Sequence, residues 1–87
     1  MRLDKFLKIS RLAKRRTEAK EALDAGRIEC DDRAVKPSHH VKVGDVLLIH
    51  YAGRDVRVRI EAVPDRPGAR VRPESLYTLL SDSRRSA

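Results

Sequence analysis

The fold is decided by residues 2–26, RLDKFLKISRLAKRRTEAKEALDAG, which combine two short amphipathic patterns with a dense run of positive charge. In the first pattern, four residues fall on one side of a helical wheel: Leu3, Phe6, Leu7 and Ser10. The residues on the other side are charged: Arg2, Asp4, Lys5 and Lys8. This predicts a short helix with a buried stripe and a basic outer face, after which Ile9 and Leu12 continue the core through a turn.

The second pattern predicts a helix from Glu18 to Ala25, because Thr17 is a good N-cap residue and Gly26 suits the position after the last turn. Its small and apolar residues share one face, which allows a close approach to the first helix: Ala19, Ala22 and Leu23. Arg15 and Arg16 stand at its start, where the helix dipole disfavours a cation but free N–H groups suit a phosphate. From charge alone, an anion site and a solvated run of charge are equally good interpretations.

The sequence after Gly26 changes to a strand-like period and predicts a small antiparallel sheet. The expected extended segments are residues 27–30, 33–35, 41–43, 46–51 and 54–62. The segment 46–51 is almost continuously apolar, which favours a central strand, and the alternation in 54–62 puts Arg57 and Arg59 on the solvent face. The predicted fold class is therefore α+β, with two N-terminal helices packed on the sheet.

The C-terminal part gives weaker signals. Residues 64–73 form a loop rich in Pro, Gly and Arg. The helical spacing of Leu76, Leu79 and Leu80 favours a short helix, although Tyr77 and Thr78 would also suit a strand. Residues 81–87 are expected to be a frayed tail. A chain of 87 residues has room for one small core.

Positive charge is concentrated near the N-terminus. The net charge of the whole chain is +7. Residues 1–42 carry twelve Lys/Arg against seven Asp/Glu, a net of +5, and residues 43–87 carry eight against six, a net of +2. A localised patch favours a specific polyanionic partner over diffuse solubilising charge.

The cysteine content and the lack of long apolar runs favour a cytoplasmic location. Cys30 is the single cysteine, which excludes an internal disulfide and fits a reducing setting. No apolar run is long enough for a signal peptide or a membrane span. We expect a cytoplasmic protein that does not enter a membrane, and a monomer.

Signals for metal or cofactor binding are weak. His39 and His40 are adjacent, and neither they nor His50 stand at a ligand spacing from Cys30, so no metal site is expected. No glycine-rich phosphate loop follows a strand, and nothing indicates a positioned catalytic triad. The sequence therefore predicts no cofactor.

Asp4 is the one acidic residue within the first basic helix. It could act as a general base, but compensation of the helix dipole or pairing with Arg2 or Lys8 is the better interpretation. We therefore expect that the protein is not an enzyme.

Phosphate recognition is the chemistry that remains. Phe6 is assigned to the core, so Tyr51 and Tyr77 alone make no stacking platform for single-stranded bases. Structured RNA that is read through its shape and backbone fits better. The candidate contacts are basic residues near the N-terminus: Arg2, Lys5, Lys8, Arg11, Lys14, Arg15 and Arg16, with Arg27, Lys36 and Lys42 as flanks.

The blocks RLDKFLK and KRRTEAKEAL, a strand after Gly26, and KPSHHVKVGDVLLI occur in that order. Together they resemble the ribosomal protein S4-type RNA-binding domain over about residues 2–50. The resemblance implies an alpha-L fold, in which two N-terminal helices and the nearby sheet edge contact structured RNA, usually ribosomal. We accordingly divide the chain into an S4-type domain over 1–50, a hairpin strand and short element over 51–80 that extend it, and a tail over 81–87.

A free-standing domain of this size, with RLDKFL at its start and SRLAKRRTEAKE after it, is similar to a narrower family. This is the family of bacterial ribosome-associated quality control P-site factors, relatives of heat shock protein 15. The resemblance implies binding to large ribosomal subunits that carry a nascent chain, through rRNA and P-site tRNA, beside a factor that directs alanine tailing. It also implies that Arg2 and Arg16 are the key RNA contacts, with Asp4 near them.

The turn after the first strand departs from the family pattern. The family usually has Asn-Gly there, whereas this chain has Asp31 and Asp32. Because Asp tolerates positive φ less well than Gly, we expect a longer or different turn. Its two negative charges also make a phosphate contact at this tip unfavourable.

Two other functions stay open at the level of sequence. Domains of this type often precede pseudouridine synthases or methyltransferases, so the chain could be the RNA-binding accessory of an RNA-modifying enzyme. It could also be a heat shock protein 15-like rescue factor that is not coupled to tailing.

Overall fold

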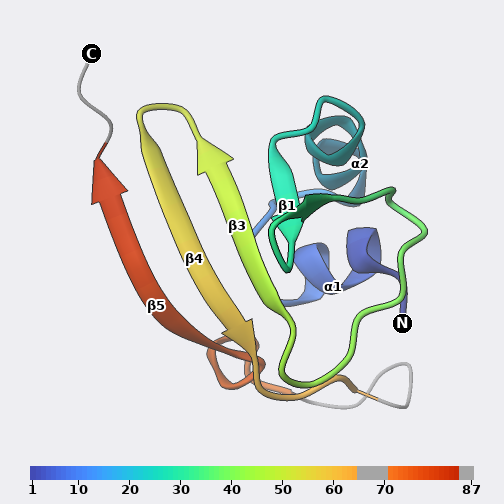
Figure 1. Cartoon of the computed structure of the whole chain (residues 1–87). Helices are drawn as coiled ribbons and strands as arrows, with labels where there is room; N and C mark the ends of the chain where they lie inside the picture. Colours follow the sequence, from blue (N-terminus) through green and yellow to red (C-terminus); the bar gives the residue numbers. More distant parts are fainter. Residues whose placement is uncertain (65–70, 85–87) are drawn as a thin grey trace.

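The computed structural model describes residues 1–64 and 71–84 and shows two short helices packed beside a five-stranded antiparallel sheet (Figure 1). The helices are α1 (Leu3–Ile9) and α2 (Arg16–Asp24). The strands are β1 (Ile28–Cys30), β2 (Arg33–Ala34), β3 (Val46–Tyr51), β4 (Arg54–Ile60) and β5 (Tyr77–Arg84), and a 3-10 turn, η1, spans Pro73–Ser75. Their order across the sheet is β2-β1-β3-β4-β5. The α+β prediction and the central place of residues 46–51 are confirmed.

The apolar stripe of α1 lies at the centre of the core. Leu3, Phe6 and Leu7 are fully buried and pack with Ala19 and Leu23 of α2. The inward-facing residues of the sheet complete the cluster: Ile28, Leu47, Ile49, Val56, Val58 and Ile60. No helix in the described part of the chain is both long and apolar enough to cross a bilayer.

Helix α2 begins earlier than the sequence predicts. Arg15 is its N-cap residue and Arg16 its first residue, so the assignment of Thr17 as N-cap is wrong. No side chain caps this end, and the Arg15 carbonyl accepts the first helical hydrogen bond from the Ala19 N–H at 3.1 Å. Gly26 follows the helix with a φ of 72°, as predicted for a residue that can leave the helix in the left-handed region.

The turn between β1 and β2 is short, contrary to expectation. Asp31 and Asp32 take φ values of 50° and 67° and alone connect the two strands. Asp31 is anchored to Val46, because its N–H donates to the Val46 carbonyl at 2.9 Å and its Oδ1 accepts the Val46 N–H at 3.1 Å. Asp tolerates this region when such local hydrogen bonds hold it.

The loop between β2 and β3 lies against the N-terminus. Residues 41–43 were expected to be extended, but they form no strand. Instead the Val41 N–H donates to the Met1 carbonyl at 3.0 Å, and Arg2 and His40 form an isolated antiparallel bridge. The loop therefore fixes the start of α1.

The predicted helix at residues 76–80 is wrong, because Tyr77–Arg84 forms β5 at the edge of the sheet (Figure 1). Leu76 is buried, but Leu79 and Leu80 are 55% and 41% exposed. Ser81 pairs with β4 next to Leu79, so Leu80 is an extra residue at a β-bulge. The helical spacing of these leucines therefore does not reflect a buried helix face, because the segment is a strand with a bulge at Leu80.

The prediction of a frayed tail over residues 81–87 is wrong for residues 81–84. Because β5 continues to Arg84, residues 81–84 belong to the sheet, and residues 85–87 lie outside the described part. The predicted loop over 64–73 falls partly on residues 65–70, which are likewise outside it.

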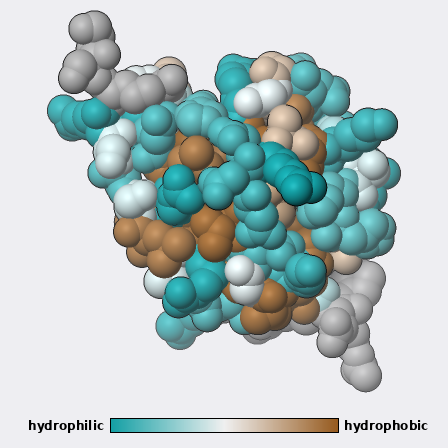
Figure 2. Space-filling model, in the orientation of Figure 1, coloured by the Kyte–Doolittle hydropathy of each residue, from teal (hydrophilic) through white to brown (hydrophobic). Residues whose placement is uncertain are grey.

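Hydrophilic side chains cover most of the face shown in Figure 2, and apolar side chains gather in a few patches. The large apolar residues that stay exposed are Val43, Val71, Leu79 and Leu80. None of them lies on α1 or α2, so the surface of the helix pair is polar and charged.

Candidate nucleic-acid interface

Asp4 lies in the first turn of α1, where its carboxylate accepts hydrogen bonds from two arginines. Its Oδ2 accepts from Nη2 of Arg2 at 3.1 Å, and its Oδ1 accepts from Nε of Arg2 at 3.2 Å. Oδ1 also accepts from Nη2 of Arg16 at 3.3 Å and from the Lys5 N–H at 2.8 Å. One carboxylate thereby connects the N-cap of α1 to the first residue of α2. We call Arg2, Asp4 and Arg16 the arginine cluster.

The arginine cluster is buried at its centre and exposed at its edges. The Asp4 side chain is 0% exposed, whereas the side chains of Arg2 and Arg16 are 42% and 46% exposed. The wheel pattern was therefore wrong in placing Asp4 on the outer face, while pairing with Arg2 is confirmed. A carboxylate can stay at this depth because four hydrogen bonds replace its lost hydration.

The charge state of Asp4 follows from these contacts. Burial raises the pKa of its carboxyl, but the hydrogen bonds from Arg16, Arg2 and the Lys5 N–H outweigh burial and hold that pKa below its usual value of 3.8. Asp4 is therefore ionised at neutral pH. The arginine cluster carries one net positive charge, and its two guanidinium groups are held in place with part of each facing solvent.

Most other cations of the helix pair have no acidic partner. Within residues 1–64 and 71–84, five of the predicted contacts form no ion pair: Lys5, Lys8, Arg11, Lys14 and Arg15. The arginines of β4 differ, because Arg54, Arg57 and Arg59 pair with Asp82, Asp32 and Glu61 at 3.5, 3.7 and 2.7 Å. Among the described residues, cations without an ion pair are thus concentrated on the helices and their connection, and Arg27, Arg33, Lys36 and Lys42 add others outside them.

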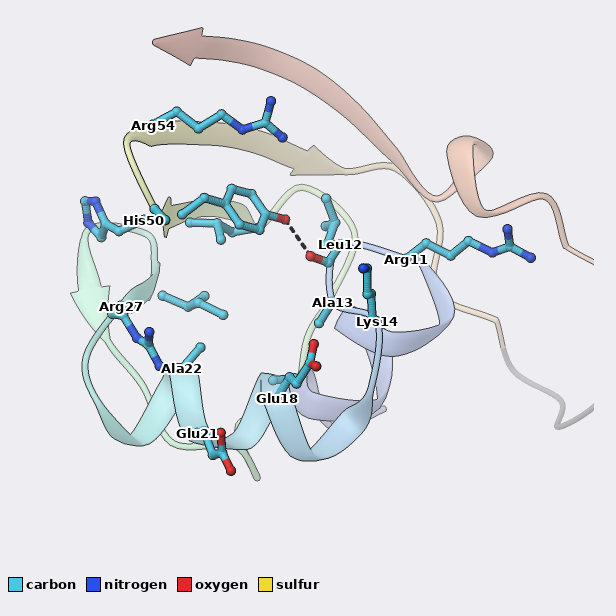
Figure 3. A pocket seen from close by; sticks show the side chains of 15 residues that line it. Arg11, Leu12, Ala13, Lys14, Glu18, Glu21, Ala22, Arg27, His50 and Arg54 are labelled. Carbon is cyan, nitrogen blue, oxygen red and sulfur yellow. Dashed lines mark hydrogen bonds between the residues drawn. The ribbon is translucent and has the colours of Figure 1, made fainter. Parts of the chain in front are cut away.

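A hollow of about 650 Å³ lies beside the connection between α1 and α2 (Figure 3). The predicted contacts Arg11 and Lys14 line it, together with the predicted flank Arg27. Arg54 of β4 also lines it. Sequence reasoning missed Arg54, which follows the β3–β4 turn and carries no local signal for a place near α2.

The end of β3 is tied to the helix connection by Tyr51. Its hydroxyl donates a hydrogen bond to the Leu12 carbonyl, drawn as a dashed line in Figure 3. The Arg54 guanidinium lies 5.3 Å from the centre of the Tyr51 ring, a cation–π contact. Tyr51 therefore holds β3 against the helix connection at the hollow, and the Arg54 guanidinium lies over the Tyr51 ring.

The remaining predicted contacts, Lys36 and Lys42, are exposed on the loop between β2 and β3. This loop supports α1, because the carbonyls of Pro37 and His39 accept the N–H groups of Asp4 and Leu3 at 3.2 and 2.7 Å. No hydrogen bond or ion pair joins either lysine to the arginine cluster within the described residues. They flank the cluster without joining it.

Comparison with known proteins identifies the family of this chain. A family model of the S4 domain matches residues 1–47, more than half of the chain. The RQC P-site tRNA stabilizing factor of Listeria innocua is 42% identical over 84 residues, which cover 97% of this chain and 90% of that protein. The chain belongs to this family of S4 domain proteins. The factor of the same name from Bacillus subtilis is also 42% identical, over 97% of this chain and 96% of its own length.

A solved structure shares the fold of nearly all of the chain. The trimeric structure of heat shock protein 15 from Vibrio cholerae has a TM-score of 0.81 and 28% sequence identity. The similarity covers 93% of this chain and 82% of that one, so it includes part of the sheet that follows the S4 domain match. That relative is a trimer, whereas the prediction of a monomer for this chain stays a prediction.

Proposed function

We propose that this S4 domain protein binds the large ribosomal subunit through rRNA and P-site tRNA, and stabilises peptidyl-tRNA on obstructed subunits during ribosome-associated quality control. The observation that carries the proposal is the arginine cluster, in which buried Asp4 positions two half-exposed guanidinium groups. The names of relatives that match along nearly the whole chain support it. Such a protein acts in the cytoplasm, as a binding protein and not as an enzyme.

The cluster suits an RNA backbone because of how its charges are placed. Arg2 and Arg16 come from different helices, and each guanidinium can donate further hydrogen bonds to phosphate oxygens. Arg16 also opens α2, whose first N–H groups have no side-chain cap. A fixed pair of cations recognises where phosphates lie in folded RNA and needs no base contact.

The proposal has three further parts. Residues 1–50 would carry the RNA-binding surface, and residues 51–84 would extend its sheet. Asp4 would position the arginines, with Lys5, Lys8, Arg11, Lys14, Arg15, Lys36 and Lys42 adding contacts around them. Coupling to the factor that directs alanine tailing is favoured over a heat shock protein 15-like role, because identity is 42% to the P-site factors and 28% to heat shock protein 15.

The test compares two arginine substitutions in sucrose-gradient sedimentation with large ribosomal subunits. We expect Arg16→Ala to weaken association by about 1.5–3 kcal/mol, because it removes charge-assisted hydrogen bonds to phosphate. This corresponds to roughly a ten- to hundredfold loss of affinity. Arg59→Ala is the matched control, because it removes the same charge from the sheet face opposite the core, where Arg59 pairs with Glu61.

The control must co-sediment like the wild type, and both variants must be folded by circular dichroism. Wild-type co-sedimentation of folded Arg16→Ala would reject the assignment of the site. Recovery of an RNA-modifying enzyme without ribosomal RNA, in a pull-down of the wild type, would instead favour the accessory function.

A further inference from the structure

Three metal-ligating side chains meet beneath the loop that supports α1. Sγ of Cys30, a ring nitrogen of His39 and a carboxylate oxygen of Asp45 all lie within 4.8 Å of one another. They come from β1, from the loop after β2 and from the residue before β3. Sequence spacing gave no hint of this group, because the fold brings three separate segments together.

The group contains a buried carboxylate that forms no ion pair with the described residues. Asp45 is 3% exposed and Cys30 is 4% exposed. Asp45 accepts the Lys42 N–H at 3.0 Å and is hydrogen-bonded to the Cys30 thiol, but no ion pair reaches it from any described residue. A buried carboxylate without a counter-charge is costly, so a cation at this place would be favourable.

The imidazole of His39 is available for the same cation. The backbone of His39 is fixed, because its N–H donates to the Lys36 carbonyl at 3.0 Å and its carbonyl accepts the Leu3 N–H. Its ring forms no hydrogen bond or ion pair with the described residues. The His39 side chain is half-buried and lies beside a thiol and a carboxylate, so the three side chains together offer ligand atoms for one metal ion.

We propose that Cys30, His39 and Asp45 bind one Zn²⁺ ion, with a water molecule as the fourth ligand. Sulfur, imidazole nitrogen and carboxylate oxygen are the donors that zinc takes, at about 2.0–2.3 Å in tetrahedral geometry. Such bonds place donor atoms roughly 3.5 Å apart, so small side-chain shifts close the site. Mg²⁺ and Ca²⁺ prefer oxygen ligands throughout and do not suit a site with a thiolate.

Binding replaces the thiol proton by the metal. The proton leaves to solvent as the zinc–sulfur bond forms, and the hydrogen bond from the thiol to Asp45 is lost. Burial and the nearby charges of Asp45 and Asp31 raise the pKa of the Cys30 thiol to about 11, although the charge of Lys42 opposes them, so removal of this proton opposes binding. A bound ion would stabilise the loop that holds Leu3, whatever the protein's partner proves to be.

The test uses the full-length protein without an affinity tag and with its thiol reduced. Co²⁺ reports thiolate ligation by a charge-transfer band and tetrahedral geometry by its d–d bands, and Zn²⁺ should displace it. We expect one equivalent to bind to the wild type and to His40→Gln, which changes the exposed neighbour of His39 and leaves the donor set intact. His39→Gln should bind at least about tenfold more weakly, and Cys30→Ser should lose the charge-transfer band.

Thermal unfolding adds an independent measurement. Zn²⁺ should raise the Tm of the wild type and of His40→Gln more than that of His39→Gln. This comparison shows whether His39 is a zinc ligand even if Cys30→Ser does not fold. Three results would overturn the site: no stoichiometric binding to the wild type, a cobalt spectrum without a thiolate band, or equal binding by the two histidine variants.

Discussion

At the scale of single residues, Asp4 determines where two positive charges lie. Its carboxylate is fully buried, and the groups it binds reach solvent from two helices. A surface arginine without such a partner would sample many rotamers and would lose that freedom on binding RNA. Fixing Arg2 and Arg16 in advance reduces this entropic cost.

Replacement of Asp4 by Asn distinguishes the effect of arginine geometry on RNA binding from the effect of net charge. Asp4→Asn adds one positive charge, so simple attraction predicts tighter binding to RNA, whereas loss of the arginine geometry predicts weaker binding. We expect weaker binding to large subunits, and a free energy of unfolding reduced by about 1–3 kcal/mol, measured in urea. Asp24→Asn, an exposed change of the same kind at the end of α2, should alter stability by about 0.5 kcal/mol or less. Tighter binding by folded Asp4→Asn would contradict the positioning role.

The sequence was informative about some of these residues and not about others. Helical periodicity identified Leu3, Phe6 and Leu7 as core, because burial on one face is a local pattern. It put Asp4 outside, because its burial depends on Arg16, twelve positions away, and a wheel of one helix carries no such information. Charge placement put Arg2 and Arg16 among the candidate RNA contacts, and only the family resemblance singled them out as the key pair.

At the scale of elements, His50 joins three strands on the outer face of the sheet. Its Nε2 lies 2.9 Å from Oε2 of Glu29 on β1, and its Nδ1 lies 2.8 Å from Oδ1 of Asp55 on β4. Hydrogen bonds to Glu29 and then to Asp55 raise the pKa of His50 above its usual 6.5, although burial opposes them. A protonated imidazole, with N–H groups on both sides, fits this arrangement.

This bridge makes stability depend on pH in a defined direction. Because folding raises the pKa of His50, its contribution is fully present below pH 6.5 and is lost as pH rises through the folded-state value. We expect the wild type to exceed His50→Gln in free energy of unfolding by about 0.5–1 kcal/mol near pH 6, and by less at pH 9. A gap that widens with pH would reject the bridge.

The errors at the scale of elements share a cause. Leu76, Leu79 and Leu80 looked like a helix face, but edge pairing with β4 and a bulge decided the conformation. The two-residue turn at Asp31 and Asp32 likewise depends on hydrogen bonds to Val46, which is distant in the sequence. Local sequence patterns predict an element well where its own residues show which face is buried, as in α1 and β3. They fail where the conformation depends on pairing with a residue or strand distant in the sequence.

At the scale of the whole molecule, positive charge is divided between two surfaces of different character. The helix pair carries the arginine cluster and several cations without acidic partners, and Arg11 and Lys14 continue this surface to the hollow. The outer face of the sheet carries Arg57 and Arg59, each paired with an acid. We therefore expect the surface of the helix pair, and not the outer face of the sheet, to meet RNA.

Cryo-electron imaging of complexes purified on the tagged protein can show which face of the protein meets RNA. We expect large ribosomal subunits with tRNA in the P site, and Arg2 and Arg16 against RNA phosphates. A complex that presents the outer sheet face, with Arg57 and Arg59 towards the RNA, would contradict this expectation, as would a subunit whose P site contains no tRNA.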